Sequence, residues 1–223
     1  KEQFEDWRKK IEHWYMDLLG IDKKVLRWKP HSKLIFYAKA AEDMQYQFPW
    51  GFDEVSGLHY RTDYDLTTHE KHSGKELKYQ DPETNTKYSP HVVESTWGLN
   101  RNFFMILCNA YRKDDTRTYL KLQYNLAPYK VAVFPLVSNK PELVKQAEKV
   151  FDTLSSTFHA YWDDRGNIGK RYRYQDEIGT PFCVTIDYQT LEDQTVTVRD
   201  RDSMEQSRVP LSSIIAFLKN KLQ

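Results

Sequence analysis

The sequence predicts an α/β protein whose second half is a mixed α/β domain with a partly parallel sheet. Strand-like and helix-like patterns alternate after residue 130, which is typical of such a sheet with helices packed on it. Aromatic residues make up 14% of the chain, and their large rings can build cores although hydrophobic residues total only 39%. A chain of 223 residues accommodates one large domain or two small ones.

In the first half, the clearest expected element is a helix over residues 4–19. Apolar residues recur there at spacings of three and four, which places them on one helical face. Alternating apolar and polar residues after residue 43 favour a strand, and residues 58–66 form a second ordered stretch. Residues 67–90 are polar and rich in turns, with a hairpin turn predicted just before Tyr88.

A short strand over residues 91–94 and a helix over residues 99–110 complete the first part. The charged segment and the proline that follow, within residues 112–128, indicate a boundary. We therefore divide the chain into domains of residues 1–126 and 127–223.

The second domain shows a regular order of elements. Its patterns predict strands at residues 131–137, 159–162, 182–188 and 195–202, helices at residues 141–157, 168–179 and 211–222, and a turn at residues 191–195.

Charge, cysteine usage and hydropathy exclude several classes of protein. The formal net charge is +1, whereas a nonspecific nucleic-acid binder is usually more basic, so a nucleic-acid contact must come from a local cluster. Cys108 and Cys183 lie far apart in apolar runs and match no zinc spacing, which predicts reduced core thiols of a cytosolic protein. No stretch approaches the ~20 apolar residues of a membrane span, so we expect no membrane partner.

Three long segments, residues 60–101, 167–187 and 195–209, carry a resemblance to one family, in the same order along the chain. They resemble the dimeric, class II type of glycyl-tRNA synthetase, and the resemblance extends over essentially the whole chain. It implies an α+β catalytic portion with an antiparallel sheet, then an anticodon-binding domain of mixed-sheet α/β type. It also implies a cytoplasmic, homodimeric ligase that activates glycine with ATP and Mg²⁺ and transfers it to the 3′ end of glycine tRNA.

The resemblance assigns roles to residues around the class II motif 3, which is a strand, a glycine turn and a helix bearing an arginine. Here these are the strand ending at Glu94, then Gly98 and Arg101. Arg101 is expected to bind ATP together with Glu94, and Glu94 also resembles the carboxylate that receives the ammonium of glycine. Thr96 stands where the family has serine, and Arg61 resembles the arginine that binds charged groups of the substrate. A guanidinium is always charged and can form bidentate hydrogen bonds to phosphate and carboxylate groups, which suits these roles.

The sequence also departs from the family pattern. Ser56, Ser95 and Asn100 stand where the family commonly has glutamate, proline and aspartate, and the first of these removes one polar contact. The family's motifs 1 and 2 are not matched in the chain, and motif 2 carries the arginine that holds the α-phosphate of ATP. We therefore expect a fragment that cannot form glycyl-adenylate alone. For Trp97 two interpretations stay open: a wall of the glycine pocket, or core beside Phe103.

The second domain carries basic and aromatic residues in alternation. Unstacked bases are read by aromatic stacking, arginine planes and hydrogen bonds to base edges. Together with the resemblance, this pattern gives six candidates for anticodon binding: Arg171, Arg173, Gln175, Arg199, Arg201 and Glu205. The alternative is a solvated surface on which arginines pair with neighbouring aspartates.

Four of the seven histidines lie close in sequence, namely His59, His69, His72 and His91. They lack a third ligand at metal spacing, so we predict surface or hydrogen-bonding histidines and no metal site.

A competing function is a non-catalytic nucleic-acid-binding relative of the same fold, such as the accessory subunit of the mitochondrial DNA polymerase. Retention of Arg61, Glu94 and Arg101 favours the enzyme.

Overall fold

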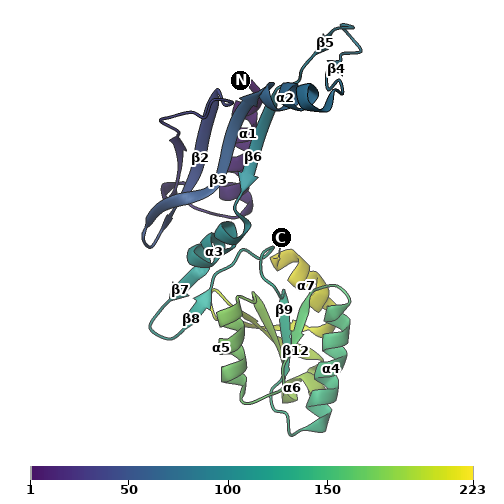
Figure 1. Cartoon of the computed structure of the whole chain (residues 1–223). Helices are drawn as coiled ribbons and strands as arrows, with labels where there is room; N and C mark the ends of the chain where they lie inside the picture. The colour runs from purple at the N-terminus through teal and green to yellow at the C-terminus, as the bar shows by residue number, and fades with distance from the viewer. Residues whose placement is uncertain (1, 223) are drawn as a thin grey trace. The chain divides into compact units, whose positions relative to one another are not determined.

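The structure is a computed structural model that describes residues 2–222 (Figure 1). It contains two compact units, Lys1–Asn109 and Ala110–Gln223. The sequence patterns place the change of domain later, between residues 126 and 127, and that family boundary stays a prediction.

The first unit is built on a four-stranded sheet in the order β1-β2-β3-β6, with every neighbouring pair antiparallel. Its strands are β1 (Leu26–Pro30), β2 (Ala40–Phe48), β3 (Gly51–Thr62) and β6 (Val92–Trp97). Figure 1 shows α1 (Glu2–His13) lying along this sheet. The antiparallel sheet expected of the first portion is thus present.

The expected helix over residues 4–19 is present but changes its winding near the end. α1 continues into a π-helical turn, η1 (Trp14–Leu18). The wider turn moves the apolar face, so that Tyr15 is buried while Leu18 is about half exposed. The single apolar stripe predicted for this helix is therefore wrong over its last turn.

The first unit also contains helical and short strand elements outside this sheet. They are η2 (Lys23–Val25), α2 (Tyr64–Ser73), the hairpin β4 (Tyr79–Gln80) with β5 (Lys87–Tyr88), and α3 (Leu99–Ala110). The hairpin and α3 confirm the sequence prediction. α2 was not predicted because it buries no residue, so its sequence shows no apolar stripe.

The second unit contains a five-stranded mixed sheet in the order β10-β9-β11-β12-β13. β9 (Val131–Pro135) pairs in parallel with β10 (Ala160–Trp162) and β11 (Phe182–Ile186), whereas β12 (Thr195–Asp200) pairs antiparallel with β11 and with β13 (Gln206–Pro210). The predicted mixed, partly parallel sheet is confirmed.

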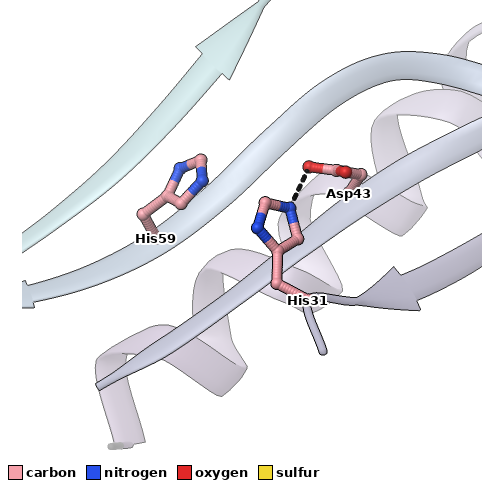
Figure 2. A group of neighbouring side chains, drawn as sticks. All are labelled: His31, Asp43 and His59. Atoms are coloured by element: carbon pink, nitrogen blue, oxygen red, sulfur yellow. Dashed lines mark hydrogen bonds and ion pairs between the residues drawn. The ribbon is translucent and has the colours of Figure 1, made fainter. Parts of the chain in front are cut away.

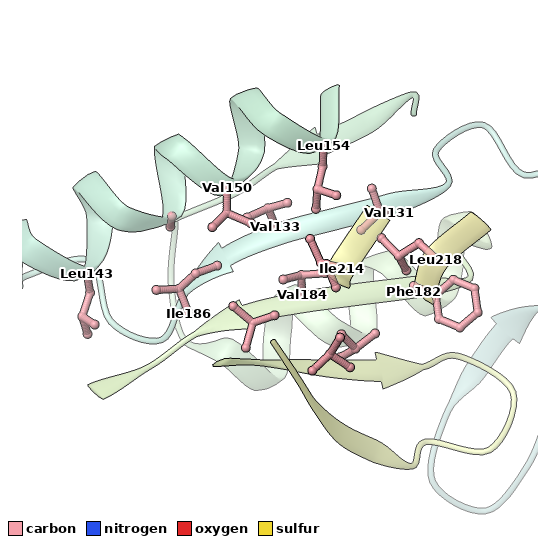
Figure 3. Packing of buried hydrophobic residues seen from close by; sticks show 14 residues of the cluster. Val131, Val133, Leu143, Val150, Leu154, Phe182, Val184, Ile186, Ile214 and Leu218 are labelled. Atoms are coloured by element: carbon pink, nitrogen blue, oxygen red, sulfur yellow. The ribbon is translucent and has the colours of Figure 1, made fainter. Parts of the chain in front are cut away.

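Helices cover both faces of this sheet (Figure 1). α4 (Pro141–Ser155) and α7 (Ile214–Lys221) bring leucine, valine and isoleucine onto valines of β9, β11 and β12 (Figure 3). α5 (Ile168–Ile178) packs on the other face, where Ile168 and Tyr172 meet Phe134 and Cys183. Apolar patterns in the sequence predicted β9, β11 and α4, whereas α5 was predicted as a short basic helix.

Short elements complete the second unit and correct the sequence prediction in places. They are the hairpin β7 (Tyr111–Lys113) with β8 (Thr118–Leu120), the helix α6 (Tyr188–Asp193) and the 3₁₀ turn η3 (Leu211–Ser213). The turn predicted at residues 191–195 is wrong for its first half, because Asp187 and Thr190 form a capping box that starts α6.

Neither cysteine is in a disulfide, and Cys183 is buried in the core while Cys108 is half-buried. Among residues 2–222, none of the helices combines the length and apolar character needed to span a bilayer.

Candidate functional site

One face of the first sheet gathers the polar side chains singled out in the sequence. On β2, Glu42 binds Arg8 of α1, so its neighbour Asp43 points to the opposite face. Residues paired across neighbouring strands point the same way, and Gly57 pairs with both Asp43 and Thr96. We call the face opposite α1 the outer face. By the same register it carries Asp43, Gly57, His59, Glu94 and Thr96, and Arg61 joins them through its hydrogen bond to Glu94.

Arg61 is the most constrained side chain of the outer face. Its Nε and Nη2 donate to the two carboxylate oxygens of Asp65 at 2.7 Å each, and its Nη1 donates to Glu94. Its guanidinium also lies 4.3 Å from the ring centroid of Tyr37. The sequence predicted Arg61 and Glu94 and missed Asp65 and Tyr37, which hold the guanidinium in place.

These contacts fix the charges of the site. Hydrogen bonding to Asp65 and to Glu94 raises the pKa of Arg61, and the bond from Arg61 lowers the pKa of Asp65. The outer face therefore presents a charged guanidinium that binds both carboxylate oxygens of Asp65 and also donates to Glu94. A carboxylate accepts several hydrogen bonds, so Glu94 keeps capacity for a further donor such as an ammonium.

Thr96 and His59 lie directly over Gly57. The hydroxyl of Thr96 approaches the carbonyl of Gly57 at 3.5 Å, and a Cβ atom at Gly57 would be 2.9 Å from that hydroxyl and 3.0 Å from Cε1 of His59. The absence of a side chain at position 57 thus sets where both outer-face residues sit.

We expect Gly57→Ala to displace Thr96 and His59 and to cost about 1–3 kcal/mol of unfolding free energy through overpacking. Urea unfolding would measure the loss. Gly169→Ala is the control, because its Cβ would meet the nearest atom only at 3.5 Å. Equal stability of the two variants would show that Gly57 is not tightly packed.

Arg101 lies where motif 3 predicts it, in the first turn of α3 after Gly98. The observed order of β6, glycine and helix confirms the predicted arrangement. The Nη1 of Arg101 donates to the carbonyl of Glu54 at 2.8 Å, and the side chain is 47% exposed. Its guanidinium is therefore accessible to a ligand, and its role toward ATP stays a prediction.

Trp97 does not belong to the outer face. Strand alternation turns it toward α1 and η1, where its ring stacks on Tyr15 at 5.4 Å and meets the edge of Trp14 at 4.7 Å. Its indole nitrogen donates to Ser95 at 2.9 Å. Trp97 thus packs against Trp14 and Tyr15 rather than Phe103, and its role as a wall of the glycine pocket stays a prediction.

Four of the six anticodon candidates have buried side chains engaged in the second unit. Arg171 donates to the carbonyls of Pro135 and Gly166, and Arg201 donates to those of Gly179 and Leu122.

Arg199 forms two hydrogen bonds to Asp176, at 2.8 and 3.0 Å, and Gln175 accepts one from Thr180 at 2.6 Å. Contact of these four side chains with a base would require breaking these bonds, and their role in base recognition stays a prediction.

The other two candidates, Arg173 and Glu205, are exposed. The sequence missed a row of rings near Arg173. In it Tyr129 stacks on His159 at 4.8 Å and meets Tyr161 at 4.9 Å, and Tyr161 meets Tyr174 at 6.0 Å. We call these four rings the aromatic row. Residues of two loops, a strand and a helix contribute to it, so no single sequence window reveals it.

The histidines that cluster in sequence do not meet in space as a group. His91 bonds to the hydroxyl of Tyr60, and His72 is exposed on α2. His59 instead lies beside His31 and Asp43, two residues that the sequence did not single out.

The comparisons with known proteins cover both units. A family model described as "Anticodon binding domain" matches residues 130–221. The chain is 46% identical over 225 residues to a glycine–tRNA ligase of Borrelia garinii subsp. bavariensis, covering 97% of the chain and 50% of the relative. It is 46% identical to the glycine–tRNA ligase of Chlorobaculum tepidum, covering 99% and 48%, and 45% identical to that of Clostridium tetani, covering 100% and 49%.

The chain spans about half the length of these relatives. Identity at this level across nearly all of its residues means that both units share ancestry with the corresponding half of those proteins. The chain is therefore homologous, along nearly its whole length, to about half of a glycine–tRNA ligase, and its residues 130–221 match an anticodon-binding domain.

Proposed function

We propose that this chain is part of a ligase that activates glycine with ATP and transfers it to the 3′ end of glycine tRNA. The observation that carries the proposal is the similarity of nearly the whole chain to ligases of that name. The alternative of a non-catalytic binder is not favoured, because the relatives are ligases and Arg61, Glu94 and Arg101 are retained.

In this proposal the outer face binds glycine. Glu94 receives the ammonium of glycine, while Arg61, held by Asp65 and Tyr37, binds the negative charge that the substrates bring. Thr96 offers a hydroxyl next to Glu94 on the same strand face. The attack of the glycine carboxylate on the α-phosphate of ATP then releases pyrophosphate.

Binding of ATP depends on Arg101 and on Mg²⁺. The exposed guanidinium of Arg101 suits stacking on a base and contact with phosphate. Mg²⁺ binds with the substrate phosphates and neutralises part of their charge. Magnesium prefers oxygen ligands that are largely phosphate and water, so it enters as part of the ATP complex.

The second unit supplies tRNA recognition. We place base contacts on the exposed residues Arg173 and Glu205 and on the aromatic row, since stacking on rings contributes about 1–3 kcal/mol per base. The buried residues Arg171, Gln175, Arg199 and Arg201 hold the elements that present this surface.

The proposal is tested by glycine-dependent exchange between ATP and pyrophosphate. We expect exchange in the full-length protein and none with the 223 residues alone, since the arginine expected to hold the α-phosphate lies in a motif that these residues do not match. The control reaction replaces glycine by alanine. Exchange that does not depend on glycine in the full-length protein would refute the proposal, and exchange by the 223 residues alone would refute the predicted incompleteness.

A further inference from the structure

Two histidines and an aspartate meet on the outer face, outside the set of residues assigned to glycine or ATP. His31 follows β1, Asp43 lies on β2 and His59 on β3, and Figure 2 shows the three side chains side by side. Nε2 of His31 lies 2.8 Å from a carboxylate oxygen of Asp43, and the two imidazole rings are 5.6 Å apart, edge to face. One ligand atom of each residue lies within 4.8 Å of the other two.

This spacing is close to that of a tetrahedral metal site. Ligand bonds of 2.0–2.2 Å place tetrahedral ligand atoms about 3.3 Å apart. The ligand atoms of His31 and Asp43 are already within that distance, and that of His59 lies within 4.8 Å of both, so His59 has to move closer for the site to close. Register supports the arrangement, because β2 and β3 are paired and Gly57, which faces Asp43, leaves room for the His59 ring.

His59 has an independent need for a polar partner. Its Nδ1 is buried and makes no hydrogen bond with the described residues. A buried nitrogen without a partner costs about 1–3 kcal/mol. A cation bound by the ring would give this histidine the polar contact that the described residues do not provide.

The donor set selects the kind of metal. Imidazole and carboxylate together suit zinc and its transition-metal neighbours, whereas magnesium and calcium prefer oxygen ligands. Three protein ligands leave the fourth tetrahedral position to water or another small ligand.

We propose that His31, Asp43 and His59 form a binding site for one Zn²⁺ or similar divalent transition metal ion on the outer face. The site lies on the strand face that also carries Glu94, the register partner of His59. It does not rest on the ligase activity, because its ligands are a separate set of side chains.

The test is a titration of the metal-free 223-residue chain with Zn²⁺, followed by calorimetry. We expect one ion per chain, and a loss of affinity of at least tenfold in both His31→Gln and His59→Gln. The matched control is His72→Gln, an exposed histidine outside the trio, which should bind zinc as the wild type does. Absence of saturable binding, or unchanged affinity in the two trio variants, would overturn the proposal.

A second measurement covers the case that a trio variant fails to fold, as judged by circular dichroism. Co²⁺ replaces Zn²⁺ in the wild-type chain, and its visible absorption reports the ligands and geometry. We expect the intense bands of a tetrahedral site with nitrogen and oxygen ligands and a higher melting temperature with metal bound. An octahedral spectrum, or one with sulfur charge-transfer bands from Cys108 or Cys183, would place the metal elsewhere and overturn the proposal.

Discussion

Asp176→Asn should destabilise the second unit by about 3–5 kcal/mol, because it removes the acid that two buried arginines share. Asp176 lies between Arg199, which donates two hydrogen bonds to it, and Arg117, whose Nη1 is 2.9 Å from its second oxygen. All three side chains are nearly inaccessible to water. Burial opposes the charge of Arg199, yet its bonds to Asp176 raise its pKa. Asparagine keeps the volume but removes the charge that both guanidinium groups share, and Arg117 retains Asp114 at 3.6 Å from its Nε.

Hydrogen exchange followed by mass spectrometry would measure this loss, since it reports the stability of each unit separately. We expect faster exchange in α5, β12 and the hairpin of β7 and β8, and no change in the sheet of the first unit. Asp152→Asn, an exposed aspartate on α4, is the control and should be neutral. A loss of unfolding free energy below about 1 kcal/mol for Asp176→Asn would show that the contacts of Asp176 with Arg117 and Arg199 are not what joins these elements.

Glu94→Gln should lower kcat/KM for glycine by about 30-fold to a thousandfold or more in the full-length protein. Removing one partner of a close, hydrogen-bonded charge pair costs about 2–5 kcal/mol, and every 1.4 kcal/mol is a factor of ten. Glutamine keeps the shape of the side chain but loses the negative charge that receives the glycine ammonium. It also removes one of the two carboxylates that Arg61 contacts and leaves that of Asp65.

The same assay separates binding from positioning. Asp65→Asn should have a smaller effect, about tenfold, because Asp65 orients Arg61 without contacting substrate in the proposed site. Glu83→Gln, on the exposed turn between β4 and β5, is the control. If Glu94→Gln retained wild-type kcat/KM for glycine, the carboxylate of Glu94 would not be the ammonium acceptor.

The parts of the fold with strong hydrophobic patterns could be predicted from sequence. β9 is buried at every position, and α4 buries one residue per turn along its inner face. By contrast, β13 buries only Val209 and α2 buries nothing, so neither carries a periodic signal. Short elements held by a cap or a hairpin, such as α6, depend on local hydrogen bonds that apolar spacing does not record.

The candidate site, too, could be predicted from the sequence only in part. Arg61, Glu94 and Arg101 stand in motifs, so a family resemblance finds them. The contacts between these residues are not visible in the motifs. The contact of Arg61 with Glu94, for example, depends on the register between β3 and β6, which includes an irregularity near Tyr60. For the arginines of the second unit, sequence could not distinguish an exposed base-reading side chain from one buried against Asp176, since both occur in charged, aromatic-rich segments.

Binding of glycine tRNA to this chain tests the assignment most directly. Affinity would be measured at one fixed, moderate salt concentration for the natural tRNA and for the same tRNA with its second and third anticodon bases changed. We expect each changed base to weaken binding about 5- to 150-fold, corresponding to about 1–3 kcal/mol per lost base contact. Equal affinity for the natural and changed tRNAs would contradict anticodon recognition by the second unit.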